Sequence, residues 1–286
     1  MKRKHEITFI KHDAPKTKLP KSIIDRPLHK RLDKNPITKN LNKSAFWIVT
    51  GPPGSGKTSF VTSMFDVGCP FYQLFDYIHA FMPENNLKSL EDCLWHDLPE
   101  EQLHYELTAD ELDKIEEDAK KRREEDENSE EHVLIVIDDM QAHLKEKEIQ
   151  KVLNRLAANR RHLNMTIIIM LQNYILCPKQ TRKLGTDFFA FNLTTDDAEL
   201  LRQEHVELER EIWDNVRNTF LYRLTKSIEE AKEKNERPKK HFLYLNKQNQ
   251  QYFIDYDELV LPSQRSEYYK NKGVMIEDND HSSQSN

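Results

Sequence analysis

The chain lacks any apolar run close to the roughly 20 residues that a membrane-spanning helix requires. One of its longest apolar segments, Met165 to Leu171, is far shorter. The first residues, 1–13, are charged and contain no apolar core of the kind found in a signal peptide. These absences exclude an integral membrane protein with a helical span. They predict a soluble, cytoplasmic protein.

Cysteine is scarce as well. Cys69, Cys93 and Cys177 stand far apart and lack the close pairing that metal-binding motifs show. Isolated cysteines in odd number exclude a disulfide framework and suit a reducing compartment. We therefore predict three small thiols that are buried or partly buried and carry no chemistry.

Glycine is equally rare, since the chain has only six, and three of them lie between Gly51 and Gly56. The segment GPPGSGKT fits the pattern G-x-x-x-x-G-K-[ST], in which glycine lets the backbone curl closely around phosphates. An apolar, β-branched run (Ala45 to Val49) precedes it, and Thr58 to Phe65 can continue as a helix. The pattern predicts a nucleoside triphosphate site made by Gly51, Pro52, Pro53, Gly54, Ser55, Gly56, Lys57, Thr58 and Ser59.

Four residues have predicted roles around a bound magnesium triphosphate. Lys57 would reach the β- and γ-phosphates and Thr58 would bind Mg²⁺, next to the positive end of the helix. Asp138 follows Val133 to Ile137, an apolar run typical of a strand buried on both faces. Its carboxylate is therefore expected at the C-terminal edge of the sheet. We assign Asp138 to Mg²⁺, directly or through water, and Asp139 to polarising the attacking water.

Further catalytic candidates follow other predicted elements. Gln172 ends the strand Met165 to Leu171, where it could orient water and sense the γ-phosphate; a hydrogen-bonded turn residue is the alternative. Phosphoryl transfer also needs a cation at the transition state, often an arginine finger. Arg160 and Arg161 end an amphipathic helix and Arg182 precedes a strand, so either region is a candidate. A surface or helix-end cation is the alternative for each.

Strands and helices alternate along the chain. Ile149, Val152, Leu153, Leu156 and Ala157 form one apolar stripe, which predicts a helix over 146–161. Alternation of this kind implies βαβ units and a three-layer α/β sandwich with a mainly parallel sheet. A helix is expected over 195–220 and a hairpin at the C-terminal end. The other predicted strands are 77–81, 165–171, 188–193, 241–246 and 251–255.

Charge and composition divide the chain further. Residues 1–40 are rich in lysine and proline and predict an extended basic arm, which could contact nucleic-acid phosphates. Residues 41–260 form the predicted ATPase domain, with an acidic helical insertion at 84–131. Within it, Thr108 opens a capping box for a charged helix that we expect to project and pack lightly. Residues 261–286 are polar and predict a disordered tail.

Four segments together resemble a known family. They are IVTGPPGSGKTSF at 48–60, VLIVIDDM at 133–140, NRRHLNMTIIIMLQNY at 159–174 and PKQTRKLGTDFFAFNL at 178–193. In order and spacing they resemble the genome-packaging ATPases of large DNA viruses, a poxvirus-type branch of the HerA/FtsK superfamily. The first two motifs occur in many P-loop enzymes, and the third is more specific. The resemblance covers about residues 41–225.

The resemblance implies a P-loop NTPase fold in which the Gln172 strand lies between the P-loop strand and the Asp138 strand. It implies a homo-oligomeric ring, hexameric in the family, that hydrolyses ATP with Mg²⁺ and moves double-stranded DNA into a capsid. A capsid or portal component is the implied further partner, and the host cytoplasm, viral factory or virion the implied place. Most superfamily members outside the viral branch have Asp-Glu where this chain has Asp138–Asp139, so which carboxylate acts as the base stays open.

Two other functions fit the same loop. A P-loop kinase would transfer phosphate to a small acceptor, but it usually needs an arginine-rich lid, whereas the paired acids and Gln172 favour water. A non-hydrolysing assembly factor would bind ATP only to hold its shape. Other P-loop ATPases such as helicases complete the alternatives.

Overall fold

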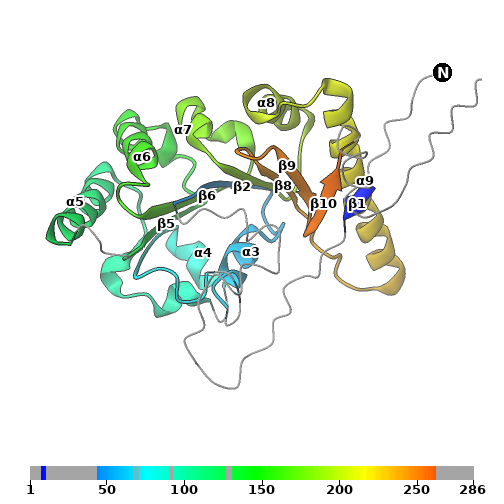
Figure 1. Cartoon of the computed structure of the whole chain (residues 1–286). Helices are drawn as coiled ribbons and strands as arrows, with labels where there is room; N and C mark the ends of the chain where they lie inside the picture. Colours follow the sequence, from blue (N-terminus) through cyan, green and yellow to red (C-terminus); the bar gives the residue numbers. More distant parts are fainter. Residues whose placement is uncertain are drawn as a thin grey trace, which may run out of the picture.

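The structure is a computed structural model that describes residues 8–10, 44–66, 69, 71–90, 93–126 and 131–261. Its centre is a ten-stranded mixed sheet with the strand order β1-β10-β9-β8-β7-β2-β6-β5-β3-β4 (Figure 1). The strands are β1 (Thr8–Ile10), β2 (Phe46–Thr50), β3 (Tyr77–Phe81), β4 (Leu103–His104), β5 (Val133–Asp138), β6 (Met165–Leu171), β7 (Asp187–Ala190), β8 (Leu243–Asn246), β9 (Gln251–Ile254) and β10 (Asp257–Val260).

Strands β7, β2, β6, β5, β3 and β4 run parallel to one another, and β8, β9, β10 and β1 continue the sheet in antiparallel pairing. All seven residues of β6 are buried, because this strand lies between β2 and β5 and has helices on both faces. Parallel strands that are covered on both faces carry unbroken apolar runs, and for this reason such runs in the sequence correctly predicted β5 and β6. The strand that precedes Gln172 therefore lies between the P-loop strand and the Asp138 strand.

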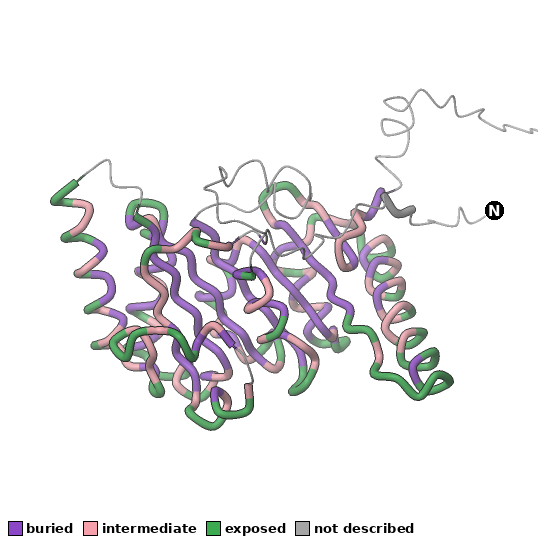
Figure 2. The backbone as a smooth tube through the Cα atoms, turned by 90° about the horizontal axis from the view of Figure 1, so that it is seen from below, coloured by how far each residue is buried: buried purple, intermediate pink, exposed green. Residues whose placement is uncertain are grey.

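Helices cover both faces of the sheet (Figure 1). Apolar residues of α5, α6, α8 and α9 form one core cluster with one face, and those of α3 and α4 form a second cluster with the other. Figure 2 shows the buried residues following the strands, with exposed residues on the outer helices and turns. The helices are α3 (Lys57–Ser63), α4 (Glu84–Lys88), α5 (Ala109–Glu125), α6 (Lys147–Asn159), α7 (Lys179–Leu184), α8 (Thr195–His205) and α9 (Arg210–Lys234), with 3₁₀ turns η1 (Leu94–Asp97), η2 (Glu100–Gln102), η3 (His143–Lys145) and η4 (Tyr174–Leu176).

The amphipathic stripe predicted for α6 is confirmed, since its five apolar members are all buried against the sheet. The helix predicted over 195–220 is divided instead. Helix α8 ends at His205, and α9 begins at Arg210 and extends to Lys234. None of the helices among the described residues combines the length and the apolar character that a bilayer span needs.

The expectation that the charged helix α5 projects from the domain is wrong. The capping box is present, because Thr108 Oγ1 accepts a hydrogen bond from the Glu111 backbone N–H at 3.2 Å. However, Leu112, Ile115 and Ala119 are buried in the core cluster that also contains α6. Three small or aliphatic residues on one side are enough for a close helix–helix seam, and strand β4 of the same acidic segment pairs with β3. The insertion is part of the sandwich.

The hairpin predicted at the C-terminal end is confirmed as β8 and β9, which pair antiparallel around a turn at 247–250. Strand β10 follows directly, and β1 from the basic arm pairs with it; neither was predicted. The remainder of the arm, and residues 262–286 of the predicted tail, lie outside the described residues. Cys69, Cys93 and Cys177 are buried free thiols, as predicted.

Candidate functional site

The glycine-rich segment forms a tight loop between β2 and α3. Gly56 precedes the helix with φ 102°, a left-handed conformation that glycine adopts at little cost. At Gly51 the limit is space, because a Cβ atom would lie 2.7 Å from Ser55 Oγ and 2.8 Å from Phe191 Cβ. Within the part of the chain that the structure describes, no side chain caps the first turn of α3, so its backbone N–H groups are open to a ligand. The buried Ser55 hydroxyl also has no hydrogen-bond partner among the described residues.

Lys57 is buried although it carries a charge. Its ammonium donates hydrogen bonds to the backbone oxygens of Gly51 at 2.7 Å and Pro52 at 3.3 Å, inside the loop. Burial lowers the pKa of Lys57, and the carboxylates of Asp138 and Asp139 offset part of this effect. Among the described residues, this cation donates its hydrogen bonds to neutral carbonyl groups, so an anionic phosphate in the loop would be a far better partner.

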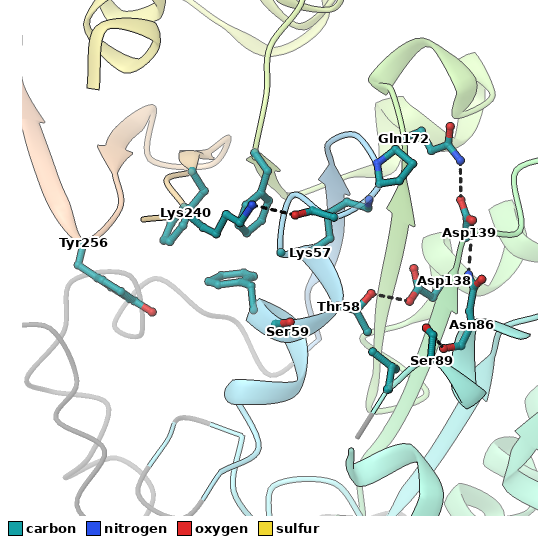
Figure 3. A pocket seen from close by; sticks show the side chains of 17 residues that line it. Lys57, Thr58, Ser59, Asn86, Ser89, Asp138, Asp139, Gln172, Lys240 and Tyr256 are labelled. Atoms are coloured by element: carbon teal, nitrogen blue, oxygen red, sulfur yellow. Dashed lines mark hydrogen bonds between the residues drawn. The ribbon is translucent and has the colours of Figure 1, made fainter. Parts of the chain in front are cut away.

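The hydroxyl of Thr58 donates a hydrogen bond to Asp138 Oδ2 at 2.8 Å. Thr58 lies in the first turn of α3 and Asp138 at the end of β5, so the glycine loop and the acidic strand meet at the same edge of the sheet (Figure 3). Burial raises the pKa of Asp138 to about 6, with Asp139 adding to the increase, while the Thr58 hydrogen bond and Lys57 oppose it. A carboxylate with this pKa gains from a nearby cation that keeps it ionised.

Asp139 is held by two amide side chains. Gln172 Nε2 donates to Asp139 Oδ1 at 3.2 Å, and Asn86 Nδ2 donates to Asp139 Oδ2 at 3.4 Å. Asp139 itself has φ 58°, a left-handed conformation that few residues other than glycine adopt. Strain of this kind is commonly found at functional sites. The structure thus brings Gln172 and Asp139 together, as their positions after β6 and β5 predict.

These groups line a cleft of about 670 Å³ over the loop and the start of α3. Asp138, Asp139, Gln172 and Asn86 lie at one end of the cleft, and Lys240 and Tyr256 lie toward the other (Figure 3). Proline and aromatic side chains form much of the remaining wall: Pro53, Phe60, Phe191 and Phe242.

Arg160 is not positioned as an arginine finger. It is buried, and its guanidinium donates to the backbone oxygens of Ser44 at 2.7 Å and Ala157. Ser44 precedes β2 whereas Gly51 follows it. At ~3.3 Å per residue, the strand separates Arg160 from the loop by roughly 16 Å. The guanidinium holds the opposite edge of the sheet together, so we withdraw Arg160 as a catalytic candidate.

Two other arginines have different environments. Arg161 directly follows Arg160, is exposed, and does not line the cleft of its own chain. Arg182 forms a buried bidentate pair with Glu204, with both N–O distances 2.9 Å, and donates to the Cys177 backbone oxygen at 2.7 Å. Its guanidinium has no free donor face for a neighbouring subunit.

Several residues of the cleft were not predicted from the sequence. The sequence did contain a signal for Asn86, because it follows the parallel strand β3, and the C-terminal ends of the parallel strands meet at this edge. The sequence contains no comparable signal for Lys240, Phe242 and Tyr256. These residues flank the strands of the C-terminal hairpin, which is far from the phosphate loop in the sequence.

The residues present fit a magnesium triphosphate. The described residues contain no cluster of three or more histidine, cysteine or acidic side chains that could enclose a metal. Mg²⁺ does not need one, because it is usually held by one or two carboxylates together with phosphate oxygens and waters. Thr58 and Asp138 supply a hydroxyl and a carboxylate at one point next to the loop, and Lys57 supplies the phosphate-binding cation.

The strand order and the loop define the class of protein. A glycine loop after β2, an acidic pair after β5 and a polar residue after the strand between them, on a mainly parallel α/β sheet, make this chain a P-loop NTPase. A comparison with protein-family models matches residues 34–246, more than half of the chain, to the family described as Poxvirus A32 protein. The chain belongs to that family, which confirms the resemblance drawn from the four motifs.

Comparison with solved structures gives similar folds at low identity. The genome packaging NTPase B204 from Sulfolobus turreted icosahedral virus 2, in complex with ATP-gammaS, is 15% identical with a TM-score of 0.47, over 75% of this chain and 98% of that one. The DNA-packaging ATPase B204 from Sulfolobus turreted icosahedral virus is 13% identical with a TM-score of 0.49, over 75% and 98%.

The cytoplasmic domain of the Type VII secretion ATPase EccC from Thermomonospora curvata is 12% identical with a TM-score of 0.45, over 77% of this chain and 24% of that one. Comparison with curated proteins finds no significant match. Since these likenesses are distant, the fold class rests on the chain's own strand order and loop.

Proposed function

We propose that this chain is an ATP-driven motor that moves double-stranded DNA into a viral capsid, hydrolysing ATP to ADP and phosphate. The single observation that carries the ATPase assignment is the 2.8 Å contact between Thr58 Oγ1 and Asp138 Oδ2, which unites the phosphate loop and the acidic strand at one point. Membership in the Poxvirus A32 protein family, and the resemblance of the four motifs to genome-packaging ATPases, support the packaging role.

In this proposal each residue has one task. Lys57 would neutralise charge on the β- and γ-phosphates, and Thr58 and Asp138 would hold Mg²⁺, which would draw electron density from the transferred phosphoryl group. Asp139 accepts a proton from the attacking water, while the water oxygen bonds to the γ-phosphorus and the bond to the ADP oxygen breaks. Gln172 and Asn86 fix the direction of the Asp139 carboxylate, so that it faces one position of the water.

The proposed assembly is a ring, hexameric as in the family, with duplex DNA as a partner that is bound without base readout. Contacts to phosphates alone would suit a motor that must move along any sequence. Arg161 stays our candidate for a cation supplied to a neighbouring subunit, because it is exposed. A capsid or portal component would anchor the ring, in the host cytoplasm or viral factory.

ATP turnover by the full-length chain, with and without long duplex DNA, tests the function. We expect DNA to stimulate phosphate release, less so at higher salt, and Lys57→Ala to abolish it. Lys88→Ala is the matched control, since this exposed lysine pairs with Glu84 on α4, and it should leave turnover unchanged. Size measurements in each nucleotide state report ring formation.

Three results would contradict the motor. Absence of turnover together with tight ATP binding would select an assembly factor. Transfer of phosphate to a small acceptor without DNA would select a kinase. Turnover that duplex DNA leaves unchanged would separate the ATPase from translocation.

A further inference from the structure

The C-terminal hairpin forms one end of the nucleotide cleft. Lys240 and Phe242 lie just before β8, and Tyr256 lies in the turn between β9 and β10, yet all three line the same cleft as Lys57 and Thr58. Figure 3 shows Tyr256 and the acidic pair on opposite sides of the phosphate loop. About 180 residues of sequence separate Lys57 of the phosphate loop from Lys240, so their meeting is a property of the fold.

Aromatic rings back this end of the cleft. The ring centroids of Phe242 and Tyr256 lie 5.6 Å apart in an edge-to-face arrangement, and Phe242 also contacts Phe60 at 4.8 Å and Phe191 at 5.7 Å. Phe60, Phe191 and Phe242 are buried, whereas Tyr256 is only half-buried and forms the lip. A partly open aromatic ring on a buried aromatic base is a surface on which a flat ligand can stack.

Asp255 fixes the position of this lip. Its carboxylate lies 2.7 Å from His241 Nδ1 and accepts a hydrogen bond from the Phe242 backbone N–H at 3.1 Å. Its own backbone N–H donates to the Phe242 oxygen at 2.8 Å. These contacts join the start of β8 to the turn that carries Tyr256, so the ring is held in place before any ligand binds.

Lys240 lies across the phosphate loop. Its ammonium donates to the Gly54 backbone oxygen at 2.9 Å, and its Cγ lies 3.4 Å from where a Cβ of Gly56 would be. The exposed lysine thus connects the hairpin to the loop. Its contact is with the loop backbone, which is a positioning role.

The direction of a bound triphosphate follows from the two ends of the cleft. Phosphates belong at Lys57 and Thr58, and the terminal phosphate must face the acidic pair and Gln172 for water to reach it. The other end of the ligand then leaves toward the hairpin. On the basis of the proposed function, we propose that Tyr256, backed by Phe242, is the surface on which the base of the nucleotide stacks, and that Lys240 positions the phosphate loop.

Binding measurements with two ligands test this proposal. Calorimetry would give the affinity of the full-length chain for ATP and for inorganic tripolyphosphate, each with Mg²⁺. We expect Tyr256→Ala to weaken ATP about 10-fold and to leave tripolyphosphate unchanged, while Tyr256→Phe keeps both affinities. Lys240→Ala should weaken both ligands by a similar factor. Tyr222→Ala is the matched control, because this tyrosine is 66% exposed on α9 and lines no part of the cleft.

The outcomes separate this inference from the function on which it rests. A parent chain that binds neither ligand would overturn the proposed function. In the other case the parent chain binds both ligands. If the Tyr256→Ala variant then loses affinity for both equally, or for neither, the stacking surface is overturned and the proposed function is not. A Tyr256→Trp variant gives a second readout that does not depend on the alanine variant folding. Its added fluorescence should change with ATP and not with tripolyphosphate, and the reverse pattern would overturn the stacking contact.

Discussion

Asp139 illustrates how two neutral side chains can prepare a charged one. The amides of Gln172 and Asn86 each bind a different carboxylate oxygen, at 3.2 and 3.4 Å. An amide donor fixes the direction of a carboxylate without adding a charge that would compete with the Mg²⁺ proposed at Asp138. In the proposed mechanism, the pair would define where a proton is accepted, next to the terminal phosphate.

Asn86→Ala should lower the rate of ATP turnover and leave ATP affinity nearly unchanged. The substitution removes one of the two amides that orient Asp139, and loss of orientation costs roughly 10-fold or more in a proton-transfer step. Steady-state kinetics and equilibrium binding would measure the two effects separately. Asn85→Ala is the matched control, since Asn85 is exposed on the same helix α4. An Asn86→Ala variant with normal kcat would show that Gln172 alone holds the base.

Lys57, Thr58, Asp138, Asp139 and Gln172 could be predicted because each follows a buried parallel strand or belongs to a local motif. Parallel strands bring their C-terminal ends to one edge of the sheet. A polar residue that directly follows such a strand in the sequence is therefore expected at that edge in the fold. Such a rule cannot place Lys240 or Tyr256, because antiparallel strands of the hairpin present either end at that edge. A different argument failed for Arg160: its position at a helix end indicated a free cation, although its donors are used inside the fold.

Helix α5 is joined to α6 by a partly buried ion network. Glu116, with a side chain only 2% exposed, accepts from Arg155 Nε at 2.7 Å and lies 2.7 Å from Lys120 Nζ. Asp113 also pairs with Arg155. A buried carboxylate that loses its cation is strongly destabilising, whereas an apolar replacement of both partners is nearly neutral.

Arg155→Met should therefore lower the free energy of unfolding by about 2 kcal/mol, a value below that of a fully buried pair because Arg155 is 40% exposed and Lys120 remains. Denaturant unfolding measures the change. Lys151→Met on the same helix breaks an exposed pair with Glu148 and should change it by less than about 0.5 kcal/mol. Adding Glu116→Leu to Arg155→Met should restore most of the loss. A double variant as unstable as the single one would contradict the account of the buried carboxylate.

The turn η4, helix α7 and helix α8 meet around His205. Its Nε2 lies 2.8 Å from the Tyr174 hydroxyl, which donates to Glu204 at 2.9 Å. Burial lowers the pKa of His205 to about 4, with Lys247 and Arg182 adding to the decrease and Glu204 opposing it. His205 therefore remains neutral in the folded chain at pH values at which the unfolded chain binds a proton.

The sign of the pH effect follows from this difference. In the unfolded state His205 binds a proton below about pH 6.5, whereas in the folded state it does so only below about pH 4. The free energy of unfolding therefore decreases as the pH falls from about 6.5 to about 4. Between pH 7 and pH 5, the His205→Phe variant should lose less free energy of unfolding than the parent, by an amount on the order of 1–2 kcal/mol. Denaturant unfolding at both pH values measures it. His162→Phe, at an exposed histidine, should decline like the parent, and an equal decline in all three chains would refute the role of His205.

The helices and strands whose own apolar residues follow a regular pattern could be predicted. Those whose position depends on contacts with another element could not. The seven apolar residues of β6 and the stripe of α6 determine their own burial. Helix α5 has only a few apolar residues, and the ion pairs with Arg155 of α6 add to its packing, so its burial cannot be predicted from its own sequence. Strands β1 and β10 are short and depend on their partners: β1 pairs with β10, and β10 pairs with both β1 and β9.

Strand β1 joins the two ends of the described chain. Thr8 pairs with Val260, Phe9 with Leu259 and Ile10 with Glu258, so residues near the N-terminus complete a sheet edge formed at the C-terminal end (Figure 1). Without β1 the edge of β10 would present unpaired backbone groups to solvent. The pairing therefore protects an element next to the nucleotide cleft, because β10 follows directly on Tyr256.

Deletion of residues 1–11 should release that edge while the parallel core stays intact. Hydrogen exchange of peptides over 257–261 should become about 10-fold faster or more, because local opening of an edge strand costs far less than global unfolding. Peptides over β6 are the internal control, since every residue of that strand is buried between β2 and β5. Equal acceleration in β6 would mean that β1 stabilises the whole fold, and unchanged exchange in β10 would mean that the pairing contributes no protection.

The same deletion also tests whether β1 affects the nucleotide cleft. Loss of ATP affinity with normal tripolyphosphate affinity would link this remote strand, through β10 and Tyr256, to the binding of the base.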